Sequence, residues 1–228
     1  MGNIMQKFLM VAALAAVMPL SSAALADDDR NGWYGGLSIG ASVVPDIETF
    51  NLINPAAEEE LEVNTGYAII GSIGHRYNAN LRTEVEAGWR SFNADTLKDN
   101  AGGFGPYSMD GTVQVQNLGV NGYYDFNMDS WITPYIGIGI GGEHAKANVH
   151  RSGASASNKW DGQDWAFYYQ GMLGVTVPVQ DRSEMFFEYR YTASEGLDIQ
   201  SNFGAFTPDA NQNELKLHTL SIGARYRF

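Results

Sequence analysis

The chain has 228 residues, of which 26 are glycine, 12% are aromatic and none is cysteine, and its formal net charge is −12. The absence of cysteine excludes a disulfide scaffold and thiolate metal sites. The acidic balance argues against nucleic acid as a partner, because the phosphate backbone favours clustered lysine and arginine. A mean hydropathy of −0.23 excludes a protein of several membrane helices, yet the glycine and aromatic content is high for an ordinary soluble domain.

The first 26 residues have the features of a secretory signal peptide. Lys7 precedes an apolar run from Phe8 to Met18, and small residues end at Ala26. The run is too short to cross a bilayer as a helix, and the acidic segment Asp27–Asp29 follows it in place of a positive flank. We expect cleavage after Ala26, which leaves residues 27–228 as a single domain.

From residue 32 onward, apolar residues alternate with small or polar ones in eight blocks of roughly ten residues, the length that a tilted strand needs to cross a bilayer. In the third block, for example, Leu81, Val85 and Trp89 share one face, and charged residues occupy the other. Within the fourth block the alternation shifts near Gln116 and Asn117, which predicts a β-bulge.

The gaps between these blocks alternate in length. Short gaps at 78–80, 127–130 and 180–183 alternate with long gaps at 44–62, 94–111, 143–163 and 193–212. Transmembrane barrels have this arrangement, with tight periplasmic turns, long extracellular loops and both termini on the periplasmic side. The sequence therefore predicts an all-β fold, an eight-stranded antiparallel up-and-down transmembrane β-barrel.

Aromatic residues gather near both ends of the predicted strands, where interfacial girdles form in membrane barrels. The candidates at the short-turn rim are Trp33, Tyr77, Tyr124, Phe126, Trp131 and Tyr226, and those at the outer rim are Trp89, Trp165, Phe167 and Tyr191.

The charged residues on the second face of the strands predict an ion-pair network inside the barrel, because an eight-stranded barrel is just wide enough for side chains to fill. The network candidates are Arg82, Glu84, Glu86, Arg90, Glu188, Arg190, Arg225 and Arg227. Five arginines against three glutamates predict an interior that leans basic, in which the two remaining arginines meet Asp125 or tyrosine hydroxyls.

Motifs along the whole mature chain resemble the small outer-membrane β-barrels of Gram-negative bacteria, the OmpA-like, opacity-protein or surface-antigen type. These motifs are GWY at 32–34, YYDF at 123–126, TPYIGIGIGG at 133–142, YQG at 169–171, EYRY at 188–191 and GARYRF at 223–228. The resemblance implies an outer-membrane location, contact with outer-membrane lipids and lipopolysaccharide, and assembly by the barrel assembly machinery. In such families this machinery reads a terminal aromatic, which Tyr226 and Phe228 match, as strand addition at an open edge would allow.

Cofactor and acid–base motifs in the chain are weak. Gly137, Gly139 and Gly142 match a dinucleotide fingerprint as a string, but the strand that should lead into a helix is missing. Glu84 and Glu86 could form an acid–base pair, although the interior network accounts for them better.

A catalytic role for the histidines is also weakly supported. His150 and Ser152 have the spacing of a lipid A deacylase, but they fall in a long loop without a fixed acid. A metal pair of His144 and His150 has no further support. We therefore expect that the protein is not an enzyme and that it binds neither a cofactor nor a metal ion.

The four long loops are the expected seat of function, because loops of this length are uncommon unless they are functional or disordered. The first is acidic and is interpreted as solvated, the alternative being a cation-bridged contact to lipopolysaccharide phosphate. The sequence favours a structural or surface-interaction role, as a contributor to envelope integrity, a surface antigen or an adhesin with host or surface ligands. The alternatives are a narrow channel for ions or small solutes and a lipid A-modifying enzyme.

Overall fold

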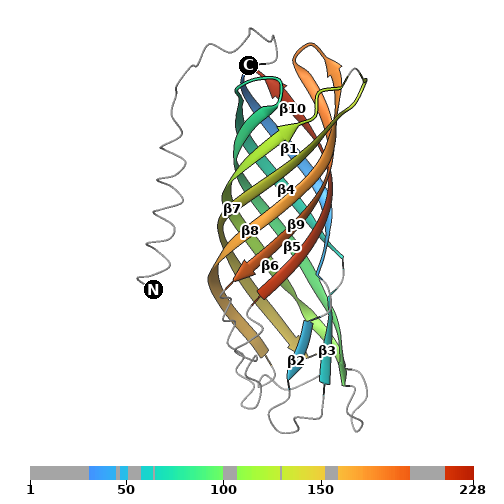
Figure 1. Ribbon diagram of the computed structural model, residues 1–228. Coiled ribbons are helices and arrows are strands. Elements are labelled where there is room, and N and C mark those ends of the chain that lie inside the picture. Colours follow the sequence, from blue (N-terminus) through green and yellow to red (C-terminus); the bar gives the residue numbers. More distant parts are fainter. Residues whose placement is uncertain are drawn as a thin grey trace.

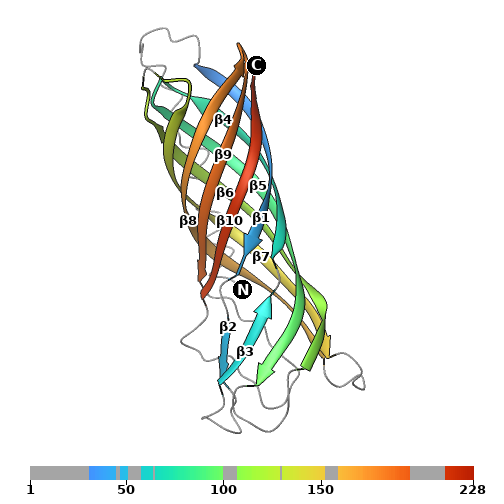
Figure 2. The same ribbon diagram turned by 90° about the vertical axis from the view of Figure 1, so that its right-hand side faces the viewer.

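The computed structural model describes residues 31–44, 47–50, 58–63, 65–99, 107–128, 130–151, 159–195 and 214–228, so the predicted signal peptide lies outside the described residues. Within these ranges, ten strands form one antiparallel sheet that closes on itself (Figure 1, Figure 2). The strands are β1 (Gly32–Val43), β2 (Ile47–Phe50), β3 (Glu58–Val63), β4 (Gly66–Arg76), β5 (Leu81–Asp99), β6 (Tyr107–Asp125), β7 (Thr133–Arg151), β8 (Lys159–Gln180), β9 (Ser183–Glu195) and β10 (Glu214–Arg227).

Eight of these strands form the barrel, and their order around the ring follows the chain once the β2–β3 hairpin is set aside. The first and last strands join in continuous register, from Tyr34 opposite Arg227 to Val43 opposite His218. β5 and β6 close the remaining gap over Leu81–Leu97. Closure matters because lipid offers no hydrogen-bond partner to an open strand edge. The predicted eight-stranded, antiparallel, up-and-down barrel is confirmed.

The alternation of the sequence becomes an inside and an outside of the barrel. On β4, Ile73 points outward and is 59% exposed, whereas Ile70 points inward and is 5% exposed. The charged face of β5 is buried, with Arg82 and Arg90 fully enclosed. Outward-facing apolar side chains thus form a continuous belt that suits lipid, while polar side chains are enclosed.

The β-bulge predicted near Gln116 and Asn117 is wrong. β6 keeps an unbroken register with both neighbours there, and Gln116 lies opposite Trp89 and His144. The alternation in the sequence shifts because the inward-facing side chains become apolar at this level, while the backbone stays regular. Val115 is fully buried inside an apolar cluster, whereas Leu118 lies on the outward face.

The strands at the outer end are longer than the sequence predicted. β5, β6 and β7 have 19 residues each and β8 has 22, so the segments predicted as loops at 94–111 and 143–163 consist largely of strand. The first predicted loop contains β2 and β3, and β3 pairs with the end of β5. A bilayer crossing takes about 9–11 residues, so these extensions lie beyond the lipid, where neither face has to be apolar and the alternation is lost.

Both chain ends of the barrel lie at the same end of the molecule. The start of β1, the C-terminus and the turns that join β4 to β5, β6 to β7 and β8 to β9 are at the top of Figure 1, and β2, β3 and the far ends of β5–β8 are at the bottom. We call these the short-turn end and the outer end. The described residues include no helix with the length and apolar character of a membrane span.

Candidate functional site

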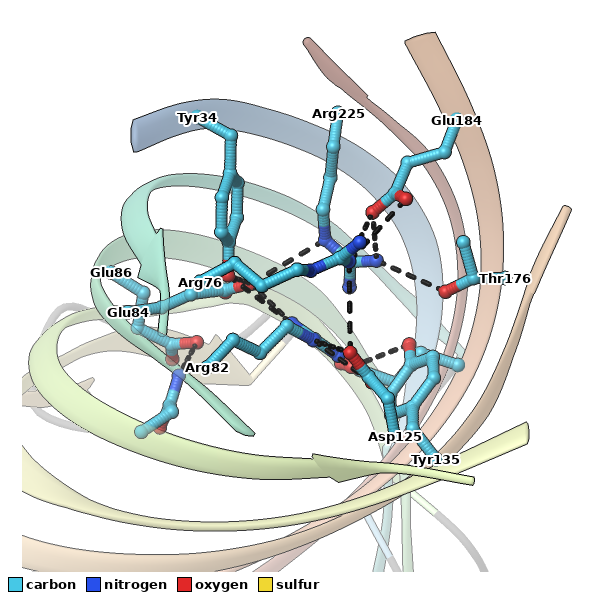
Figure 3. Close-up of polar contacts among 12 residues, drawn as sticks. Tyr34, Arg76, Arg82, Glu84, Glu86, Asp125, Tyr135, Thr176, Glu184 and Arg225 are labelled. Atoms are coloured by element: carbon cyan, nitrogen blue, oxygen red, sulfur yellow. Dashed lines mark hydrogen bonds and ion pairs between the residues drawn. The ribbon is translucent and has the colours of Figure 1, made fainter. Parts of the chain in front are cut away.

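The first layer of the interior, nearest the short-turn end, is built around Arg82. Its Nη1 donates to Glu84 Oε1 at 2.6 Å, and its Nε donates to Asp125 Oδ1 at 3.1 Å (Figure 3). The guanidinium carbon also lies 3.8 Å from the ring centroid of Tyr123 and 4.7 Å from that of Tyr135. The cation is thus held by two carboxylates and two aromatic faces, which suits a planar guanidinium.

The same layer contains two further arginines closer to the rim. Arg225 lies with Nε 3.4 Å from Glu84 Oε1 and Nη1 3.3 Å from Glu184 Oε1. Arg76 Nη2 lies 3.2 Å from the same Glu184 oxygen and 3.6 Å from Asp125 Oδ2. Since β1, β4, β5, β6, β9 and β10 all supply side chains, this layer ties the strands together across the lumen (Figure 3).

A second layer crosses the middle of the barrel. Arg190 Nη1 donates to both oxygens of Glu86, at 2.6 and 2.7 Å, and its Nη2 donates to Glu188 Oε1 at 2.8 Å. Glu86 also accepts hydrogen bonds from Asn121 at 2.6 Å and Gln170 at 3.1 Å. These side chains come from four strands and are all buried, so they occupy the cross-section of the lumen at this level.

Farther toward the outer end, the interior changes from polar to apolar. Arg90 donates to Asn117 Oδ1 at 3.0 Å, and Ser194 donates to Glu143 Oε1 at 2.5 Å. Next toward the outer end lies the apolar cluster, which has no charged member. It consists of the buried residues Val44, Phe92, Val115, Ala145 and Leu217.

The interior is electrically balanced, which corrects the expectation that it leans basic. Five buried arginines face five buried acids in the described part of the chain. The arginines are Arg76, Arg82, Arg90, Arg190 and Arg225, and the acids are Glu84, Glu86, Asp125, Glu143 and Glu188. Balance is expected, because an uncompensated buried charge carries a large desolvation penalty.

Sequence reasoning missed two members of this set. Arg76 lies on the inward face of β4, two residues beyond the inward Gly74, so the period of two placed it inside. Glu143 follows Gly141 as the next inward position of β7. It was missed because the predicted strand ended at Gly142. Arg227, in contrast, is half-buried at the short-turn rim, where its guanidinium donates to the Asp181 carbonyl.

The aromatic residues fall at the two rims of the apolar belt. At the short-turn rim, Trp33 packs edge-on against His75 with ring centroids 5.1 Å apart, and Tyr124 packs against Phe126 at 5.1 Å. The other aromatics placed at this rim are Tyr77, Trp131, Tyr226 and Phe228, of which Trp131, Tyr226 and Phe228 are exposed and Tyr77 is partly exposed.

At the outer rim, Trp89 packs against Tyr67 at 5.3 Å and Trp165 packs against His144 at 4.6 Å. Tyr191 contacts His218, whose Nδ1 also lies 2.7 Å from the Tyr189 hydroxyl. Phe167, also on the outward face of β8, is partly buried. The partners Tyr67, His144, Tyr189 and His218 were not among the girdle candidates, because only the strand register brings them beside the predicted aromatics.

The glycine string on β7 makes room for neighbouring side chains. A Cβ added to Gly137 would meet the Tyr123 ring, one added to Gly139 would meet the Asn121 amide, and Gly142 lies in the same uninterrupted strand. The string therefore lacks the strand-to-helix turn that a dinucleotide site requires. Of the histidine and serine pair, His150 lies in β7 opposite Asp110 and Lys159, and Ser152 lies outside the described residues.

We predict that Arg190→Met lowers the free energy of unfolding by about 3–5 kcal/mol, because it leaves Glu86 and Glu188 buried without their cation. The double variant Glu86→Gln/Arg190→Met should be destabilised less, since a buried charge is removed with its partner. Urea titration in phospholipid vesicles, followed by tryptophan fluorescence, measures both. Lys146→Met, an exposed cation on β7, is the matched control, and equal stability of Arg190→Met and this control would contradict the prediction.

Known proteins share this architecture. The family model described as "Outer membrane protein beta-barrel domain" matches residues 12–228. A Rickettsia massiliae protein, named as a proposed adhesin, is 22% identical over 97% of this chain and 99% of its own. The crystal structure of Neisserial surface protein A (NspA) has a TM-score of 0.51 at 18% identity, covering 86% of this chain and 97% of that one.

The outer-membrane protease OmpT from Escherichia coli has a TM-score of 0.52 at 12% identity, covering 91% of this chain and 100% of its own. At these identities the two solved structures show the fold alone. The family match covers nearly the whole chain and agrees with the closed barrel, the apolar belt and the two aromatic rims. The chain therefore belongs to the outer-membrane β-barrel family and is an outer-membrane protein of a Gram-negative bacterium.

Proposed function

We propose that this protein is a non-conducting, non-enzymatic barrel that presents a surface-interaction platform outside the outer membrane. The observation that carries this proposal is the sheet that protrudes from the outer end. β5 reaches the rim aromatic Trp89 after nine residues and continues for ten more, to Asp99. At a rise of about 3.3 Å per residue, this extension adds roughly 30 Å of strand beyond the rim.

The protruding sheet has a strand edge that is available for pairing. Within the described residues, β2 pairs only with β3, so its other edge is open to an extended partner segment. An unpaired strand edge presents N–H and C=O groups that an extended partner segment can bind. The acidic first loop contributes to this platform, since Glu48 lies in β2 and Glu58–Glu60 lie in β3.

The family context supports the same role. The Rickettsia massiliae relative bears an adhesin name, and NspA is named a surface protein. OmpT shows that such a barrel can also carry a protease, so the fold by itself assigns no activity. The host or surface ligand of the platform is expected to be a protein segment, because strand addition is the recognition mode that free edges offer.

Excising residues 94–111 tests the proposal. Asn93 and Thr112 are register partners, so an Asn-Gly turn can join them and shorten β5 and β6. We expect cells that display this variant to lose the adhesion to host-matrix-coated surfaces that the full-length protein confers, because the protruding sheet loses its central hairpin.

The matched control excises residues 196–213, also eighteen residues, and joins the register partners Glu195 and Glu214 with the same turn. This control leaves β2, β3 and β5–β8 intact and should keep adhesion. Adhesion of the 94–111 variant at the level of the full-length protein would overturn the assignment of binding to the protruding sheet.

The closed interior predicts a lack of conductance. The Glu86–Arg190 layer and the apolar cluster around Phe92 and Leu217 fill the lumen at successive levels. We expect no stepwise currents from the purified protein in planar lipid bilayers at neutral pH. The same sample should migrate faster before boiling than after boiling on a cold detergent gel, which confirms that it was folded. Reproducible single-channel steps from such a sample would support the channel alternative instead.

We also propose that Tyr226 and Phe228 form the signal for the outer-membrane assembly machinery. Phe228 N donates to Trp33 O at 3.1 Å, and its side chain lies on the outside of the seam between β1 and β10, 75% exposed. The residue therefore adds little to packing and is open to recognition. Phe228→Ser should reduce the amount of folded protein in outer membranes, measured by unboiled gel mobility. Trp131→Ser is the matched control at the same rim and exposure, and equal loss in both variants would contradict a terminal signal.

A further inference from the structure

A basin of about 350 Å³ opens at the short-turn mouth of the barrel, beneath the turn that joins β8 to β9. The structure places more cations than anions around it. The charged residues that line it are Arg76, Arg182, Arg225, Arg227, Asp181 and Glu184, an excess of two positive charges. The full chain has a net charge of −12 and the buried interior is balanced, so this local excess is opposite in sign to the chain as a whole.

The acids of the basin do not satisfy every donor of Arg76. Arg76 has a side chain that is only 9% exposed, and its Nε has no hydrogen-bond partner within the described residues. Its Nη2 shares Glu184 with Arg225, so one carboxylate serves two guanidinium groups. A buried N–H without a partner is destabilising, and a bound acceptor would remove that cost.

The layer beneath does not cancel the excess. It adds one cation, Arg82, and two acids, Glu84 and Asp125, which Arg82 contacts at 2.6 and 3.1 Å. Basin and layer together thus hold five arginines against four carboxylates. Arg82 Nη2 also has no hydrogen-bond partner in the described part of the chain.

We infer that the basin is a binding site for a carboxylate group, held by Arg76 and Arg182 with Arg225 behind them. Guanidinium groups bind carboxylates through two parallel N–H···O bonds, and the unused Arg76 Nε–H is a donor for such a bond. The opening faces the periplasm, since it lies at the short-turn end with the C-terminus.

Two sources can supply that carboxylate. One is the chain itself, because Asp27–Asp29 precede Gly32, and Gly32 is the register partner of Arg76. Three to five residues span at most about 10–18 Å, which is enough to reach the basin from Gly32. The other is a free polycarboxylate of the periplasm. Both sources present the same carboxylate chemistry, and removal of the three aspartates distinguishes them.

The test uses citrate as the probe and isothermal titration calorimetry on protein extracted from outer membranes. Its arms are the wild type and Asp27→Asn/Asp28→Asn/Asp29→Asn, with the N-terminus of each checked by mass spectrometry. We expect saturable binding of citrate to the triple variant. If the chain's own aspartates occupy the basin, the wild type should bind citrate more weakly than the triple variant. Equal affinity of the two identifies the free anion as the ligand.

Basin variants made in the triple-variant background locate the site. Arg182→Gln and Arg76→Gln should each weaken citrate binding, while Lys146→Gln, which removes the same charge at the far end of the barrel, should not. Arg182 lies on the turn and is exposed, so its loss leaves the barrel intact even where Arg76→Gln impairs folding. A triple variant that binds no citrate, or one whose binding Arg182→Gln and Lys146→Gln change equally, would overturn the proposal.

A cross-link provides an independent measurement of the source. The chain has no cysteine, so Asp28→Cys with Gln180→Cys, at the basin wall, introduces a single pair. A disulfide requires Cα atoms within about 7 Å. Cross-linking in the folded protein supports the intramolecular source, and an uncross-linked pair under oxidising conditions overturns that source while leaving the citrate result to decide the site.

Discussion

Backbone hydrogen bonding in lipid is the constraint from which the rest of this structure follows. An open strand edge would leave N–H and C=O groups without partners, so the sheet closes through β1 with β10 and β5 with β6. Eight strands fix a narrow lumen, and a narrow lumen requires small and large side chains to alternate across it. Gly137 and Gly139 therefore face Tyr123 and Asn121. The glycine content of the chain is a consequence of closure at this strand number.

Charge inside the barrel follows from the same geometry. An interior of apolar residues would turn each strand into a continuous apolar run, without the alternation of apolar outward and polar inward positions that is typical of a membrane barrel strand. Polar inward positions avoid this, but buried charges must then compensate one another. The five buried arginines and five buried acids do so across distant strands, as when Arg190 meets Glu86, 104 residues away. The network thus links strands that share no backbone hydrogen bonds.

The sequence predicted the part of the fold that lipid acts on. Contact with lipid requires an apolar outward face. The alternation of Leu81, Val85 and Trp89 with charged residues therefore identified β5 and its inward charges from the sequence alone. Beyond the rim, no lipid is present and this requirement no longer applies. The bulge near Gln116 and the loop predicted from residue 143 were wrong for this reason. Val115 turns an apolar side chain inward, and Glu143 continues a strand that no longer alternates against lipid. Which inward charges meet, and that Arg76 joins them, depends on register between segments far apart in sequence.

The outer end, the interior and the short-turn end of the barrel differ in their electrostatic character, and this difference constrains function. The buried residues in the described part of the chain sum to zero charge, so the net −12 of the chain comes from residues outside this buried set. An acidic outer surface repels the anionic lipopolysaccharide around it unless cations intervene. This repulsion favours partners that bind by backbone pairing at strand edges over partners that bind by charge. At the short-turn end, the arginines of the basin reverse the sign locally. A barrel sealed by neutral layers can therefore carry opposite preferences at its two ends without either field reaching the other through the lumen.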